Sequence, residues 1–170
     1  PAKLAAAATG VGGQTEQYLA DLSRIAEVDA LARAVGAKHK RLDVLINNAG
    51  VLKTPNPVTT GGYDLRFVVN TIAPYALTRQ LLPLMNGAGR VINLASAAQA
   101  PVDMAAFAGQ RRLADMEAYA QSKLAITAWS AALARELPDG PVVVSVNPGS
   151  LLATNMVRQG FGIAGNDIGI

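Results

Sequence analysis

Three short apolar runs, each followed by small or polar residues that end a strand, strongly constrain how this chain can fold. The runs cover residues 42–47, 91–94 and 142–146, and such compact runs are typical of strands buried on both faces of a sheet. Segments with helical periodicity separate them, at residues 63–86 and 115–137. Strands that alternate with helices build parallel sheets, so the sequence predicts an α/β fold with a parallel sheet and flanking helices.

The N-terminal part of the chain fits the same plan. Residues 16–21 are a candidate for a further short strand, which ends at Asp21. Ser23 is a candidate N-cap for an amphipathic helix over residues 24–35. Residues 1–8 have the pattern of the end of a helix, and 98–117 are less regular, with room for one short helix. With 170 residues, we expect a single domain.

Composition excludes several classes of function. The chain has no cysteine, which excludes thiol chemistry, and its single histidine with no close carboxylate cluster predicts no metal site. The net charge of +3 comes from scattered residues without interleaved aromatics, so we expect no nucleic-acid partner. No apolar run is long enough to span a membrane and no signal peptide is visible, so we predict a cytoplasmic protein.

Tyr119 and Lys123 are the strongest candidates for chemistry. Residues four apart on a helix lie on one face, so the phenol and the ammonium are predicted to be neighbours. A nearby cation favours the phenolate and lowers the pKa of a tyrosine, which would let it exchange protons near neutral pH. Taken alone, the same spacing also fits an exposed pair on a helix surface.

Other candidates follow the predicted strands. The turn 47–50 has the sequence Asn-Asn-Ala-Gly, Ser96 follows the second run, and a Pro-Gly pair follows the third. Carboxyl ends of parallel strands receive ligands in open α/β sheets, although an ordinary turn or a helix cap would explain each residue alone. Pro74 cannot donate to the carbonyl of Asn70, so we expect a kink there, with the Asn70 carbonyl and side chain able to hold a water.

Taken in order, these motifs closely resemble the short-chain dehydrogenase/reductase family. The resemblance implies a Rossmann-type, doubly wound parallel sheet and an NAD(P)(H)-dependent alcohol–carbonyl oxidoreductase. It implies Tyr119 as the general acid–base, Lys123 lowering its pKa and bonding the nicotinamide ribose, Ser96 orienting the substrate and Asn70 in a proton relay. The cofactor is NAD or NADP, with no preference visible. The residues predicted to bind it are Asp21, Leu22, Asn47, Ala49, Gly50, Tyr119, Lys123, Pro148, Gly149 and Thr154.

Two departures from the family pattern carry further expectations. The Gly-rich pyrophosphate turn is missing, so residues 1–170 are expected to be one partial NAD(P)-binding domain, truncated at both ends, without the first two strands and the C-terminal strand. Alone, such a fragment should bind cofactor weakly and unfold with poor cooperativity. The long spacing between Ser96 and Tyr119 resembles the retinol-dehydrogenase-like and protochlorophyllide-reductase-like branch, which implies a small-molecule alcohol or carbonyl substrate of lipophilic character.

Three alternatives remain at this point. An extended-family epimerase or dehydratase acting on nucleotide sugars would share the Tyr/Lys pair. A nucleotide-binding regulator could keep the fold without the chemistry. A dimerisation module is the third, because the Ala-rich helices resemble the family's subunit interface. That likeness also implies a homodimer or homotetramer for the full-length protein.

Overall fold

The computed structural model describes residues 5, 8–10, 13–149 and 152–166, and its centre is a parallel sheet. Within the described residues, the sheet has three strands in the order β1 (Val44–Asn47), β2 (Arg90–Leu94) and β3 (Val142–Val146). Asn47 of β1 pairs with Asn93 of β2. The three strands predicted from the apolar runs are confirmed, and all of them run in parallel.

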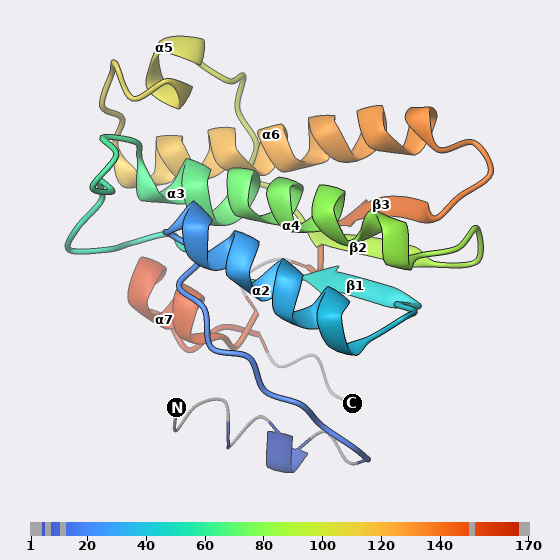
Figure 1. Ribbon diagram of the computed structural model, residues 1–170. Coiled ribbons are helices and arrows are strands. Elements are labelled where there is room, and N and C mark those ends of the chain that lie inside the picture. The colour runs from blue at the N-terminus through green and yellow to red at the C-terminus, as the bar shows by residue number, and fades with distance from the viewer. Residues whose placement is uncertain (1–4, 6–7, 11–12, 150–151, 167–170) are drawn as a thin grey trace.

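Three helices connect and cover these strands. They are α2 (Ile25–Lys38), α4 (Ala73–Leu81) and α6 (Asp115–Glu136), and Figure 1 shows them side by side across the sheet. The predicted helix that carries Tyr119 and Lys123 is therefore confirmed almost to the residue. Shorter elements are α3 (Leu65–Phe67), η1 (Val68–Ile72), η2 (Leu82–Leu84), α5 (Met104–Phe107) and α7 (Asn155–Phe161).

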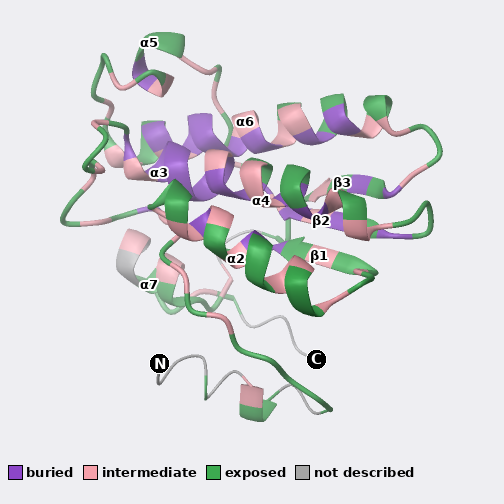
Figure 2. Cartoon of the chain, in the orientation of Figure 1, coloured by how far each residue is buried: buried purple, intermediate pink, exposed green. Residues whose placement is uncertain are grey.

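The helices cover only one face of the strands. Val91 and Val143 pack against Leu133 of α6 in a buried cluster. On the opposite face, Val44 and Ile46 keep 43% and 58% of their surface exposed, as Figure 2 shows along β1. The prediction of strands buried on both faces is therefore wrong for the described residues. The physical reason is that α2, α4 and α6 all pack on the same side, so alternate strand residues have no covering layer.

Residues 16–21 do not form the predicted strand. Their backbone pairs with none of the three strands, and side-chain contacts hold the segment instead. Glu16 forms an ion pair with Lys38 at 2.8 Å, and its carboxylate lies 3.0 Å from Nε2 of His39, just after the end of α2. A strand requires a neighbour that completes its backbone hydrogen bonds, and no described strand lies beside this segment.

The predicted N-cap at Ser23 is also wrong. The cap position of α2 is Arg24, whose side chain makes no capping bond, and the helix continues to Lys38. The backbone N–H of Ser23 donates to Oδ1 of Asp21 at 2.9 Å, because the residues before the helix form a turn around that carboxylate. Most of the helix end predicted at residues 1–8 lies outside the described residues.

The expected disturbance at Pro74 takes the form of a π-helical turn. Residues Val68–Ile72 form this turn directly before α4, and Asn70 lies inside it, fully buried. Proline has no N–H for the carbonyl four residues earlier, so a wider turn accommodates the missing donor.

None of the helices among the described residues is both long and apolar enough to cross a membrane.

A chain of buried polar side chains joins the sheet to α4 and α6. Nδ2 of Asn47 donates to Oδ1 of Asn93 at 2.7 Å and to Oγ1 of Thr78 at 3.0 Å. Nδ2 of Asn93 donates to Oγ of Ser130 at 2.8 Å. All four residues are buried, so each hydrogen bond replaces one that water would otherwise supply.

We expect Asn93→Ala to lower the free energy of unfolding by about 2–3 kcal/mol, because it removes buried hydrogen bonds to both Asn47 and Ser130 and leaves a small cavity. Denaturant titration measures the change. Asn56→Ala, at an exposed position, is the control and should change stability by less than about 0.5 kcal/mol. Equal effects of the two substitutions would contradict a structural role for the buried chain.

Candidate active site

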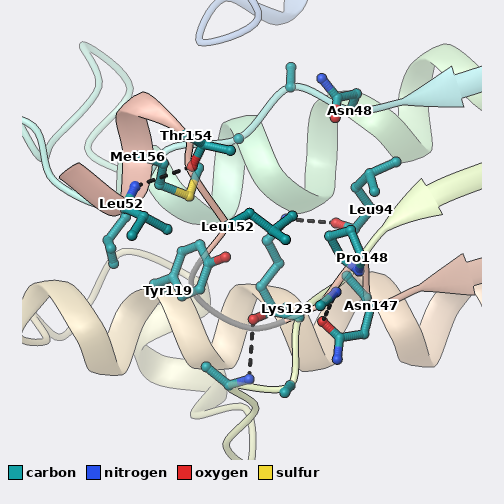
Figure 3. A pocket seen from close by; sticks show the side chains of 18 of the residues that line it. Asn48, Leu52, Leu94, Tyr119, Lys123, Asn147, Pro148, Leu152, Thr154 and Met156 are labelled. Carbon is teal, nitrogen blue, oxygen red and sulfur yellow. Dashed lines mark hydrogen bonds between the residues drawn. The ribbon is translucent and has the colours of Figure 1, made fainter. Parts of the chain in front are cut away.

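A cavity of about 620 Å³ opens where the three strands end. Asn48 follows β1, Ser96 follows β2 and Pro148 follows β3, and all three line the cavity. Tyr119 and Lys123 enter it from α6 (Figure 3). The carboxyl edge of a parallel sheet is the usual ligand site in open α/β folds, and the volume suits a small organic molecule.

The structure brings Ser96, Tyr119 and Lys123 together, as the sequence predicted. Ser96 and Tyr119 both line the cavity, and the Ser96 side chain lies near enough to the Tyr119 phenol to lower its pKa. Nζ of Lys123 lies 5.6 Å from the centre of the Tyr119 ring and donates to the Leu94 carbonyl at 2.6 Å. Lys123 is only 4% exposed, so its ammonium is held by protein groups rather than by bulk water.

The electrostatics of the pair differ from the sequence-based expectation. Burial raises the pKa of Tyr119 above its ordinary value, and the neighbouring Ser96 hydroxyl offsets only part of that increase. Burial also lowers the pKa of Lys123 to about 8. The expected net lowering of the Tyr119 pKa is therefore wrong for this structure, and the effect of Lys123 on the phenolate stays a prediction. Desolvation disfavours the charged form of each group, which raises the pKa of Tyr119 and lowers that of Lys123.

Asn70 is buried beside this group and its side-chain amide is fully engaged. Its Oδ1 accepts from the Val51 backbone N–H at 2.8 Å, and Nδ2 donates to the Val51 carbonyl at 2.9 Å. Nδ2 also donates to Oγ of Ser122 at 2.9 Å, and Ser122 in turn donates to the Tyr119 carbonyl. The side chain therefore joins the loop after β1 to α6, and the water contact expected for it stays a prediction. The relay through the Asn70 carbonyl stays a prediction.

The predicted cofactor residues divide into two groups. Asp21 and Leu22 are outside the cavity lining, in the turn before α2, and Asn47 directs its amide into the buried polar chain. Their cofactor contacts stay predictions. Seven predicted residues line the cavity: Ala49, Gly50, Tyr119, Lys123, Pro148, Gly149 and Thr154.

Gly50 shows why the cavity wall needs a small residue. A Cβ at this position would lie 3.3 Å from Cε of Met156 and 3.6 Å from both Oδ1 of Asn70 and Nζ of Lys123. Gly149, on the opposite loop, has a φ of +117°, which favours glycine. Both glycines line the cavity, so each loop presents backbone without a side chain there, and this fits a dinucleotide at the carboxyl edge of the sheet.

Sequence reasoning missed the apolar part of the lining. Leu52, Met116, Leu152 and Met156 all border the cavity. Met116 could have been found, because it precedes Tyr119 by three residues and therefore shares its helix face. Leu52, Leu152 and Met156 lie in or after irregular loops, where no periodicity gives a signal. Thr154 caps α7, accepting from the Val157 N–H at 3.3 Å, and this helix was not predicted.

A parallel sheet with a Ser–Tyr–Lys cluster at its carboxyl edge defines a Rossmann-type protein with a tyrosine-centred site. The family model described as short chain dehydrogenase matches residues 1–161. The chain belongs to the short-chain dehydrogenase family.

Individual relatives agree with this assignment. Retinol dehydrogenase 13 of Homo sapiens is 33% identical over 158 residues, covering 86% of this chain and 48% of that protein. Polyprenol dehydrogenase of Mus musculus is 33% identical over 149 residues, covering 82% and 44%. A solved metagenomic short-chain oxidoreductase in complex with NADP has a TM-score of 0.65 and 33% identity, covering 92% and 65%. The chain spans about half the length of the curated relatives it matches.

Proposed function

We propose that the protein is an NAD(P)(H)-dependent oxidoreductase that interconverts an alcohol and a carbonyl compound. The observation that carries this proposal is the convergence of Ser96, Tyr119 and Lys123 on one cavity at the strand ends. The redox chemistry of the relatives, named as dehydrogenases, is consistent with the same assignment.

In this mechanism, Tyr119 exchanges a proton with the substrate oxygen. Its raised pKa keeps the phenol protonated at neutral pH, so it is ready to donate a proton when a carbonyl is reduced. The Ser96 hydroxyl, next to the phenol, orients the same oxygen. Lys123 stabilises the phenolate that forms when the proton leaves, since opposite charges attract strongly at a site shielded from water.

The cofactor would lie along the two strand-end loops. Ala49 and Gly50 after β1, and Pro148 and Gly149 after β3, would pass close to it, with Thr154 at the start of α7 beside its carboxamide end. A bound nicotinamide supplies the hydride for reduction and accepts it for oxidation. Either NAD or NADP fits this proposal, and the solved relative with NADP supports the use of this cofactor class.

The substrate proposed for this site is lipophilic. Leu52, Met116, Leu152 and Met156 give the cavity an apolar wall beside the Ser–Tyr pair. Apolar surface of this kind binds hydrocarbon better than it binds a sugar, because a sugar would lose its hydrogen bonds to water there. The relatives named for retinol and polyprenol have substrates of the same character.

The test is made on the protein that carries these 170 residues. It is incubated with each nicotinamide cofactor and with matched alcohols and ketones of increasing apolar length, and nicotinamide absorbance is followed. We expect turnover with at least one apolar pair, and kcat/KM that increases with chain length. Failure to turn over any member of the panel, despite measured cofactor binding, would favour a nucleotide-binding regulator.

A second part of the proposal concerns assembly. A groove of about 650 Å³ between α4 and α6 is lined by apolar residues including Ile72, Tyr75 and Trp129. We infer that this face meets a second copy, giving a homodimer or homotetramer, which sedimentation velocity would detect.

The cytoplasmic location and the single partial domain over residues 1–170 stay predictions.

A further inference from the structure

Arg66 is a buried cation that the proposed chemistry does not use. Its side chain is 1% exposed, although it lies at the start of the short helix α3. Nε donates to Oδ1 of Asp64 at 2.9 Å and Nη2 donates to Oδ2 at 2.6 Å, so the two side chains form a fork-shaped pair. A guanidinium is costly to bury, and this one therefore needs every contact it makes.

The remaining contacts of Arg66 reach two different walls of the cavity. Nη1 donates to the Leu52 carbonyl at 3.3 Å and forms a short hydrogen bond with Oδ1 of Asp115. Leu52 lines the cavity in the loop after β1. Asp115 is the first residue of α6, one position before the lining residue Met116 and one turn before Tyr119.

The Arg66 side chain keeps its positive charge. Burial opposes the cation, but the hydrogen bonds and charges of Asp64 and Asp115 outweigh it, so the pKa of Arg66 is raised. Buried ion networks often add little to the free energy of unfolding compared with apolar residues of equal size. What such a network does provide is fixed geometry, because a planar guanidinium donates its hydrogen bonds only in set directions.

We propose that Arg66 is a positioning residue, which holds the first turn of α6, and with it the Tyr119 phenol, at a fixed place against the Leu52 wall. The inference rests on the proposed function, since the catalytic role of Tyr119 belongs to that proposal. Misplacement of a reacting group by about 1 Å can reduce rates by roughly 100-fold, so a clamp one turn away affects turnover without touching substrate.

The test removes the contact to α6 and leaves the Arg66–Asp64 pair intact. Substitution of Arg66 itself would strip the buried Asp64 of its partner. Asp115→Ala is therefore the informative variant, because it removes the oxygen that accepts from Nη1 of Arg66. Glu117→Ala is its matched control, because it removes an acidic side chain from the same helix turn at an exposed position away from Arg66. We expect Asp115→Ala to lower kcat about tenfold with cofactor affinity within about twofold. Glu117→Ala should leave both unchanged, and Asp115→Glu should keep most of the wild-type kcat.

A second readout does not depend on activity. The chain has no cysteine, so nitroxide labels at Lys53→Cys and Ala114→Cys, both exposed, report the separation of the two walls. Asp115→Ala should broaden their distance distribution, and Glu117→Ala should not. Wild-type kcat in Asp115→Ala, or an unchanged distribution, would overturn the positioning role. If the distribution broadens as expected but the wild-type protein turns over no alcohol or carbonyl, the clamp stands and the proposed function fails.

Discussion

Tyr119→Phe should reduce turnover by about 1,000-fold, while cofactor affinity stays within about threefold of wild type. The substitution removes one oxygen, and that oxygen is the atom assigned to exchange a proton with the substrate. General acid–base groups contribute roughly 100- to 10,000-fold to rates, so an effect of this size is expected from losing the phenol. The ring remains, so the packing of the cavity wall is preserved. Steady-state kinetics and cofactor titration measure the two quantities separately.

The matched control is Tyr75→Phe. Tyr75 lies on α4, packs edge-on against Trp129 at 5.5 Å between ring centres, and is not part of the catalytic cavity. The same change of chemistry there should leave kcat within about twofold, because surface substitutions away from a site rarely affect it. If Tyr119→Phe kept the wild-type turnover, Tyr119 would not be the general acid–base. The main support for redox catalysis would then be lost.

Lys123→Met should abolish most activity and make the folded protein more stable at pH 7. A fall in the pKa of Lys123 from 10.5 to about 8 corresponds to a cost of about 3 kcal/mol for burying the ammonium. Methionine avoids that cost but leaves the Leu94 carbonyl without its donor, which costs about 1 kcal/mol. The expected net gain is about 2 kcal/mol in the free energy of unfolding, together with at least a 100-fold loss of kcat.

The pH dependence of stability gives an independent check on the same group. Below pH 8 both folded and unfolded states carry the ammonium, so the cost of burial is fully present. Between pH 8 and 10.5 the unfolded state binds more protons than the folded one, and the stability of the wild-type protein therefore increases with pH. Lys123→Met should lose this increase, and denaturant titrations across the window would show it.

Lys53→Met serves as the control, because Lys53 is exposed in the loop after β1. It should keep the increase in stability between pH 8 and 10.5 and retain wild-type kcat. If Lys123→Met is destabilised at pH 7 and its stability still increases across the window, the buried lysine is not the source of the pH effect.

Elements with a complete local signal could be predicted from the sequence. β3 and α6 have clear apolar patterns with turn residues at both ends, and their bounds agree closely with the structure. The strand predicted at residues 16–21 is absent, because a strand depends on a neighbouring strand that the local sequence does not show. Helix α7 was not predicted, because it is short and lies in a tail with several glycines, and because Thr154 at its start was interpreted as a ligand contact rather than a cap.

Some features of the site could also be predicted from the sequence, and others could not. Ser96, Tyr119 and Lys123 could be placed together because parallel strand ends and helix spacing fix their positions. The direction of the Tyr119 pKa could not be predicted, since it depends on how much water the folded chain removes. Arg66 gave no signal either. Its role depends on Leu52 and Asp115, which are far from it in sequence and meet it only in the folded chain.

The amide pair between Asn47 and Asn93 also bears on how the strands find each other. A shift of β1 by one residue would turn Asn47 toward the exposed face and bring Ile46 opposite Thr78. Thr78 would then lose its side-chain donor, and Asn93 would lose the amide that its own oxygen accepts from. A shifted pairing of β1 with β2 would therefore be less stable than the observed one, because it would lose the buried hydrogen bonds of Asn47. The two asparagines thus favour the observed alignment of the strands.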